Sequence, residues 1–446
     1  MSSQGFSFSR DQLTGIAGHI LDHARTVGAS ACETDVSEGF GQSVTVRKGE
    51  TDTIEYNRDK GVGVTVYLGQ KRGHASTSDF SEEALRAAVE AAIQIARFTA
   101  EDPCAGLADP ELLATEIPDL DLFHPWAPAV EEALDLARRC EQAAFDTSPK
   151  ITNSEGASVS SQQSHFISAN SLGFCAGYAT TRHSVSCSVI AGHGDGMQRD
   201  DWYDSRRDVH DLQGAEEIGA TAARRAEARL GAQRIATCEL PVLFEAPLAV
   251  SLLGNFVHAA SGGALYRRAS FLVDGLDKPL FAAHVDIDER PHLRKASGSA
   301  PFDSDGVATR DRRIVAGGTL EGYFLSCYSA RKLGMQTTGN AGGSHNLKIS
   351  HGDRDFDRML ALMDRGLLVT ELLGQGVNYV TGDYSRGAAG FWVENGRVAY
   401  PVEEITIAGN LAEMFRNIVE IGADVWDRGA KHTGSILIDR MKIAGK

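Results

Sequence analysis

Fourteen histidines make a metal site the first chemistry to test in this 446-residue sequence. Two histidines four residues apart on a helix can direct both imidazoles at one zinc ion. No glutamate directly follows any histidine, so the His-Glu-x-x-His motif of zinc proteases is absent. Three pairs of histidines are considered as metal ligands: His19 and His23, His284 and His292, and His345 and His351. We interpret each of them as surface or hydrogen-bonded histidines.

Other motifs that carry chemistry are missing or incomplete. The sequence has no P-loop, no G-x-S-x-G nucleophile elbow and no G-x-G-x-x-G. Asp303-Ser304-Asp305-Gly306 resembles the start of a calcium loop, but Ile314 stands where the bidentate glutamate belongs. We predict a turn at this segment.

An apolar run, Leu252 to Ala259, contains Asn255 and His258 and leads into Ser261-Gly262-Gly263. His258 is interpreted first as a helix or core residue, because a single histidine in an apolar run usually packs there. A place in a cleft is the alternative.

Composition and charge limit the class of protein. The formal net charge of −16, without any long run of Lys and Arg, argues against nucleic acid as the main partner. Seven cysteines without a C-x-x-C pair fit reduced thiols. Met1 to Arg10 is polar, which predicts no signal peptide, and the apolar stretch Pro241 to Gly254 is interrupted by Glu245 and Pro247. We expect a cytoplasmic protein.

Residues 1–236 mix predicted helices and strands, and the regular elements must position any site. Ser9 and Ser81 are predicted to cap helices, and Gly28 to end the first one. Residues 103–128 hold five of the twelve prolines, which predicts an extended connector. Further helices are predicted at about 130–145 and 212–230. Short strands are predicted at 33–37, 43–47, 53–56, 63–68 and 73–76, with a turn at 57–61, and more strands within 151–204.

Beyond residue 237, strand-like runs alternate with glycine pairs. Only two helices are predicted there, at about 355–364 and 411–421. The predicted fold class is α+β. The predicted division is an N-terminal α+β unit (1–102), the proline-rich connector (103–128), a second α+β unit (129–236) and a C-terminal glycine-rich β domain (237–446).

Several separated blocks make the chain resemble the TldD/PmbA family, formerly called modulators of DNA gyrase, and in particular its PmbA (TldE) branch. The resemblance extends over nearly the whole chain. It is carried by Ile54-Glu55-Tyr56-Asn57, Asp102 to Gly106, Pro118 to Pro125, Pro301 to Val307, Tyr328 to Gly334, Gly382 to Gly396 and Ile407 to Asn410.

The resemblance implies a heterodimeric cytosolic metalloprotease whose TldD-like subunit holds zinc through a His-Glu-x-x-x-His helix and a C-terminal cysteine. At the motif positions this chain has Gly254, Asn255 and Ala259, and His258 stands one place early. The last cysteine is Cys327, with Thr433 near the expected ligand position. The resemblance therefore implies no catalytic residue and no metal in this chain, zinc in a TldD-like partner, and an inactive isolated subunit.

The implied substrates are extended or unfolded peptides, in peptide-antibiotic leader processing and antitoxin turnover. A glycine-rich β domain can bind a peptide as an added strand. We expect the block at 380–396 and the Gly342-Gly343 loop to face the shared cleft. The candidates for cleft or peptide contacts are Asn255, His258, Gly342, Gly343, Tyr384 and Arg386. Alternatively, Tyr384, Arg386 and Trp392 pack within the β domain or a subunit interface.

Two other functions stay open at this point. One is a stand-alone peptide-binding scaffold without protease activity. The other is a hydrolase with its own site, built from His258 and acids such as Asp286 and Asp288, although nothing pairs a nucleophile with a base. Without its partner the chain is expected to form a homodimer, because an interface suited to a related subunit exposes apolar surface.

Overall fold

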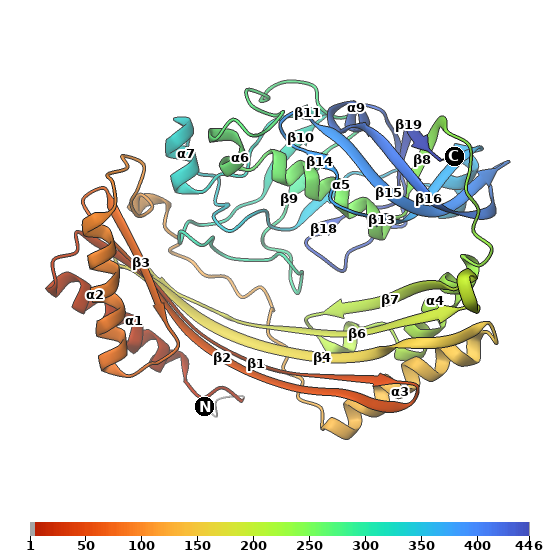
Figure 1. Ribbon diagram of the computed structural model, residues 1–446. Coiled ribbons are helices and arrows are strands. Elements are labelled where there is room, and N and C mark those ends of the chain that lie inside the picture. Colours follow the sequence, from red (N-terminus) through yellow and green to blue (C-terminus); the bar gives the residue numbers. More distant parts are fainter. Residues whose placement is uncertain (1–4, 446) are drawn as a thin grey trace.

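The computed structural model describes residues 5–445 and consists of a long curved sheet facing a C-terminal β domain (Figure 1). The sheet has the order β3-β2-β1-β4-β6-β7, with β5 paired to β4, and all its neighbouring strands are antiparallel. Its strands are β1 (Ala31–Arg47), β2 (Glu50–Leu68), β3 (Lys71–Thr77), β4 (Ile151–Asn170), β5 (Cys175–Ala176), β6 (Ala179–Ala191) and β7 (Gln198–Arg206). Strands from before and after the proline-rich connector thus share one sheet.

Four helices cover one face of this sheet. Val36 of β1 packs in the cluster beneath α1 and α2, and Val44 and Val46 pack in the cluster beneath α3 and α4. These valines have even spacing along one strand, so they point to the same face. The helices are α1 (Arg10–Thr26), α2 (Glu82–Phe98), α3 (Val130–Thr147) and α4 (Ala215–Ala228).

The locally encoded helix ends are confirmed. Ser9 and Gln12 form a reciprocal capping box at the start of α1, and Gly28 follows its end with a φ of +95°. Ser81 caps α2 by accepting a hydrogen bond from the Ala84 N–H.

The predicted turn at 57–61 is wrong. β2 continues through it for 19 residues, because β1 pairs with it along the whole length, from Ala31 opposite Tyr67 to Arg47 opposite Glu50. The ladder of backbone hydrogen bonds outweighs the local turn preference of Asn57 and Gly61.

The C-terminal domain contains a closed ring of strands, β13-β8-β19-β16-β15, in which β15 pairs back to β13. Its members are β8 (Cys238–Phe244), β13 (Gly366–Leu373), β15 (Asp383–Glu394), β16 (Arg397–Asn410) and β19 (Ile436–Ala444), with β14 (Val377–Asn378) and β17 (Ile418–Ile421) at its sides. A smaller sheet comprises β9 (Ile287–Glu289), β10 (Arg312–Ala316), β11 (Thr319–Leu320), β12 (Leu347–Ile349) and β18 (Lys431–His432). The predicted α+β fold class is confirmed.

The predicted helix at 355–364 corresponds to α8 (Phe356–Met363). The predicted helix at 411–421 is wrong in its second half: α9 covers only Leu411–Arg416, and Ile418–Ile421 forms β17 because it pairs with β19. Three more helices were not predicted: α5 (Ala246–Ala259), α6 (Gly262–Tyr266) and α7 (Cys327–Leu333). Pro247 was interpreted as an interruption, but it lies in the first turn of α5, where a helix tolerates proline. Within residues 5–445, no helix is long and apolar enough to span a bilayer.

Candidate functional site

Helix α5 has one side buried in the core of the C-terminal domain and another side at its surface. Leu252, Leu253 and Phe256 are fully buried, and Phe256 meets the rings of Phe281 and Phe415 edge-on. On another side of the helix, Pro247, Ser251, Gly254 and His258 follow one another at intervals of three or four residues and are all partly or fully exposed. We call this row of residues the α5 stripe.

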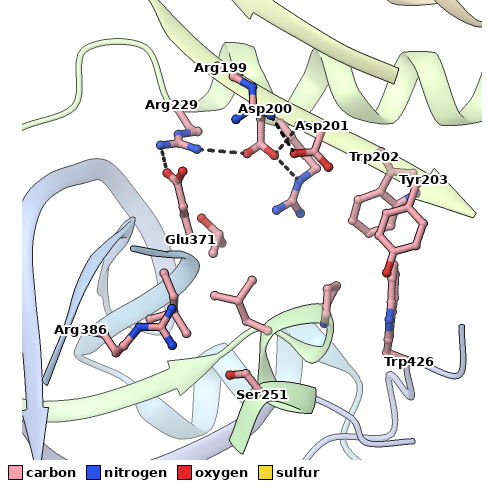
Figure 2. A pocket seen from close by; sticks show the side chains of 15 residues that line it. Arg199, Asp200, Asp201, Trp202, Tyr203, Arg229, Ser251, Glu371, Arg386 and Trp426 are labelled. Atoms are coloured by element: carbon pink, nitrogen blue, oxygen red, sulfur yellow. Dashed lines mark hydrogen bonds and ion pairs between the residues drawn. The ribbon is translucent and has the colours of Figure 1, made fainter. Parts of the chain in front are cut away.

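The beginning of the α5 stripe lines a cleft of about 360 Å³ between the long sheet and the C-terminal domain. Figure 2 shows Arg386 and Ser251 on one side of this cleft and Arg229, Asp200 and Asp201 across from them. The residues that line the cleft come from β7, α4 and the residue after it, α5, β13 and β15, together with Trp426: Arg199, Asp200, Asp201, Trp202, Tyr203, Arg225, Arg229, Pro247, Leu248, Ser251, Thr370, Glu371, Leu372, Arg386 and Trp426.

Ion pairs across the cleft connect the sheet to the C-terminal domain. Arg225 of α4 donates to both carboxylate oxygens of Glu245, at 2.7 and 3.1 Å, and pairs with Asp200. Arg229 pairs with Asp200 and with Glu371 of β13. Burial by itself disfavours the charge of Arg225, but Glu245 and Asp200 outweigh it and raise the pKa of this guanidinium. Arg225 of α4 and Arg229, the residue that follows α4, therefore both have carboxylate partners.

Arg386 differs from those arginines. Its Nε donates to the Leu373 carbonyl at 3.2 Å, and within residues 5–445 no carboxylate lies within ion-pair distance of it. It is half-buried on β15 and faces the cleft (Figure 2). This guanidinium can therefore meet an acceptor on a ligand.

Two other predicted residues meet at the far end of α5. Asn255 is 8% exposed, and its Oδ1 accepts a hydrogen bond from the Tyr379 hydroxyl at 2.9 Å. The exposed His258 ring lies against the Tyr379 ring, with 3.9 Å between centroids. Tyr379 was not singled out from the sequence, although it holds both candidates.

The remaining predicted residues lie elsewhere. Tyr384 is only 1% exposed and packs in the domain core, where burial raises its pKa to about 12. Gly342 and Gly343 are exposed in a loop, both with positive φ, and they do not line the cleft. A Cβ at Gly342 would lie 2.8 Å from the Ser304 Oγ, so this loop packs against the turn at 303–306.

The segment Asp303 to Gly306 forms a turn, as predicted. Asp303 Oδ1 accepts the backbone N–H groups of Asp305 and Val307, and Oδ2 accepts that of Ala341, so the carboxylate is used inside the protein. Three of the paired histidines have separate hydrogen bonds: His292 with Thr309, His345 with the Gly339 carbonyl and His351 with the Gly352 carbonyl. His19 and His284 are exposed, and His23 lies 3.6 Å from the Glu90 carboxylate.

The residues on α5 do not fit a zinc ion. Gly254 has no side chain, and the Cε atom of Lys431 lies 4.0 Å from the position that a Cβ there would take. Ala259 is fully buried. Across residues 5–445, no three His, Cys, Asp or Glu side chains are grouped so that they could hold a metal ion.

Comparison with known proteins decides the family. Metalloprotease PmbA of Escherichia coli O157:H7 is 48% identical over 418 residues, which cover 94% of this chain and 93% of that protein. The chain belongs to the PmbA/TldD metallopeptidase family. Three domain models of this family match in order: PmbA/TldA metallopeptidase domain 1 at residues 32–96, the central domain at 123–230 and the C-terminal domain at 237–445.

Solved structures of PmbA/TldD proteins share the fold. A protein named as a modulator of DNA gyrase from Bacteroides thetaiotaomicron matches with a TM-score of 0.93 and 26% identity, over 98% of this chain and all of that one. TldE from Thermococcus kodakarensis, at 18% identity, matches with a TM-score of 0.80 over 96% of this chain and all of that one, and shows the fold alone. The resemblance predicted from the separated blocks is confirmed.

Two of the sequence blocks that carry the family resemblance contact each other in the structure. Arg331 of α7 donates to the carbonyls of Gly106 and Leu107, and Lys332 pairs with Asp102 at 2.8 Å. The Tyr328 hydroxyl also donates to Asp102. The block at 328–334 therefore anchors the start of the connector to the C-terminal domain.

Proposed function

We propose that this chain is the subunit of a two-subunit metallopeptidase that shapes the peptide-binding cleft without holding the zinc. Its partner is a TldD-like subunit that supplies the metal, and the complex works in the cytoplasm. Its substrates are extended or unfolded peptides, such as peptide-antibiotic precursors and labile antitoxins. Membership in a metallopeptidase family supports the reaction class.

The observation that carries the division of labour is the composition of α5. A catalytic zinc site needs three protein ligands and a group that can move a proton. The α5 stripe offers a glycine at 254, with a lysine side chain beside it, where such a ligand would project. A cation at this position opposes the binding of a second, divalent cation.

Zinc content measured by elemental analysis tests this assignment. The protein is equilibrated with zinc, desalted and analysed alone and after mixing with the TldD-like subunit. We expect close to no zinc on this chain alone, and peptide cleavage only by the mixture. One zinc per isolated chain, or chelator-sensitive cleavage by it, would contradict the proposal. Peptide binding that persists while the mixture cleaves nothing would favour the stand-alone scaffold.

Arg386 provides a test of the cleft itself. In the assembled complex we expect Arg386→Ala to lower kcat/KM for an extended peptide about tenfold, because a charge-assisted hydrogen bond to the substrate is lost. Arg397→Ala, which removes an exposed arginine of β16, is the matched control. An unchanged kcat/KM for Arg386→Ala would show that this side chain does not contact the substrate.

A further inference from the structure

Two buried polar groups on α5 lack hydrogen-bond partners within residues 5–445. The amide Nδ2 of Asn255 is buried and has no hydrogen-bond partner among the described residues, and neither has the buried hydroxyl of Ser251. Asn255 uses its acceptor oxygen for Tyr379, so the orphaned group is specifically a donor. An unsatisfied buried polar group costs about 1–3 kcal/mol, so a bound molecule that supplies an acceptor to these donors would recover that free energy.

Lys431 adds a positive charge at the middle of the stripe. It lies on β18, whose pairing with β12 places Lys431 opposite Leu347. Its side chain packs beside Gly254, is half-buried, and has no ion pair or hydrogen bond to any residue within 5–445. Burial lowers the pKa of this amino group, since nothing nearby compensates its charge.

Arg386 supplies a second positive charge without a carboxylate, at the end of the stripe that lines the cleft. The acids of the cleft do not fill this role. Asp200 pairs with Arg225 and Arg229, Glu371 pairs with Arg229, and Asp201 pairs with Arg199. Asp200 and Arg229 lie across the cleft from Arg386 (Figure 2). The local arrangement therefore leaves two cations and two neutral donors available along one helix face.

We propose that Ser251, Gly254, Asn255 and His258 of α5, with Lys431 and Arg386, form a binding site for the carboxylate groups of acidic, extended peptide segments. Carboxylates and peptide carbonyls are the acceptors that this set of donors lacks. Gly254 lets a peptide backbone approach the helix closely, because no Cβ projects there. The proposal rests on the proposed function in taking a peptide as the ligand, and it adds the chemical class that the cleft selects.

Nucleic acid is a poorer match for the same cations. Binding a phosphate backbone needs a row of basic groups with the spacing of phosphates. Here two isolated cations lie on a chain with a net charge of −16. A carboxylate that binds at the α5 stripe meets Lys431 or Arg386 at short range, where the low exposure of these side chains strengthens the interaction.

Fluorescence anisotropy on the isolated full-length chain tests the site. The probes are a labelled glutamate-rich decapeptide and the same peptide with every glutamate replaced by glutamine. We expect the glutamate peptide to bind at least about tenfold more tightly, which corresponds to one charge-assisted hydrogen bond. Lys431→Met and Arg386→Met should each lower the affinity for the glutamate peptide about tenfold and the affinity for the glutamine peptide by much less, so that the preference is lost.

Two controls separate recognition from folding. Lys431→Arg retains the charge and should retain the preference, whereas Lys278→Met removes an exposed lysine that does not line the cleft and should change nothing. Circular dichroism melting confirms that each variant is folded. Equal affinity for the two peptides, no binding of either, or a preference that survives Lys431→Met would overturn the proposal. Because no second subunit is present, failure of the complex to cleave peptides would leave this result unaffected.

Discussion

At the scale of single residues, Glu289 decides whether the loop that carries Gly342 and Gly343 keeps its shape. Its carboxylate is 1% exposed and accepts hydrogen bonds from Arg312 at 2.7 Å, from Asn340 Nδ2 at 2.8 Å and from the His345 N–H at 2.8 Å. Glu289→Ala would leave the buried Arg312 guanidinium without a carboxylate and would remove an acceptor from the Asn340 amide and from the His345 N–H. We expect the free energy of unfolding to fall by about 3–5 kcal/mol, measured by urea denaturation.

The matched control is Glu82→Ala, which removes an exposed ion pair between Glu82 and Arg86 within one helix. Exposed pairs of this kind contribute about 0.3–0.5 kcal/mol. If Glu289→Ala cost no more than this control, the buried network would not be holding the loop.

At the scale of elements, one short helix holds the connector. Arg331 of α7 donates to Gly106, Leu107 and the Asp109 carboxylate, at distances from 2.6 to 3.2 Å. The connector has few regular backbone hydrogen bonds of its own, so these contacts set how often it opens. We expect Arg331→Met to accelerate limited proteolysis within residues 103–112 about tenfold, which corresponds to the loss of one or two such hydrogen bonds.

Arg397→Met serves as the control, because Arg397 is exposed on β16 and does not contact the connector. Its cleavage pattern should match that of the unmodified chain. Equal cleavage of Arg331→Met and Arg397→Met would show that other contacts keep the connector in place.

At the scale of the whole molecule, acids gather where the long sheet meets the C-terminal domain. Burial, with smaller contributions from Asp305, raises the pKa of Glu33 on β1 and of Asp303 to about 7. The folded protein thus keeps a proton that the unfolded chain has lost above a pH of about 4.5. Stability from these groups is complete below that pH and is lost as the pH rises through about 7.

We therefore expect a lower Tm at about pH 8 than at about pH 5.5, measured by calorimetry. Glu33→Gln should reduce this loss, because the amide cannot ionise and still offers an oxygen to the Tyr67 hydroxyl. Glu55→Gln, on an exposed part of β2, should leave the pH dependence unchanged. A loss of equal size in Glu33→Gln would assign the effect to other groups.

Interactions between near neighbours were predictable from the sequence. The capping box of Ser9 and Gln12, the Ser81 cap and the Asp303 turn are closed by hydrogen bonds that span two to four residues. Each follows from side-chain chemistry at a fixed short separation. Of the site, Asn255 and Arg386 were named as contact candidates only through a family resemblance, whereas His258 was also noted from its place in an apolar run.

The tertiary structure alone decided the long-range features. Asn57 to Gly61 stay in a strand because β1 pairs beside them, and α5 forms although Pro247 interrupted the apolar pattern. The cleft joins residues near positions 200, 225, 251, 371 and 386, and Lys431 approaches Gly254 across 177 positions of sequence. A local sequence pattern does not predict such long-range contacts, because strand pairing and core packing bring these segments together only when the whole chain folds.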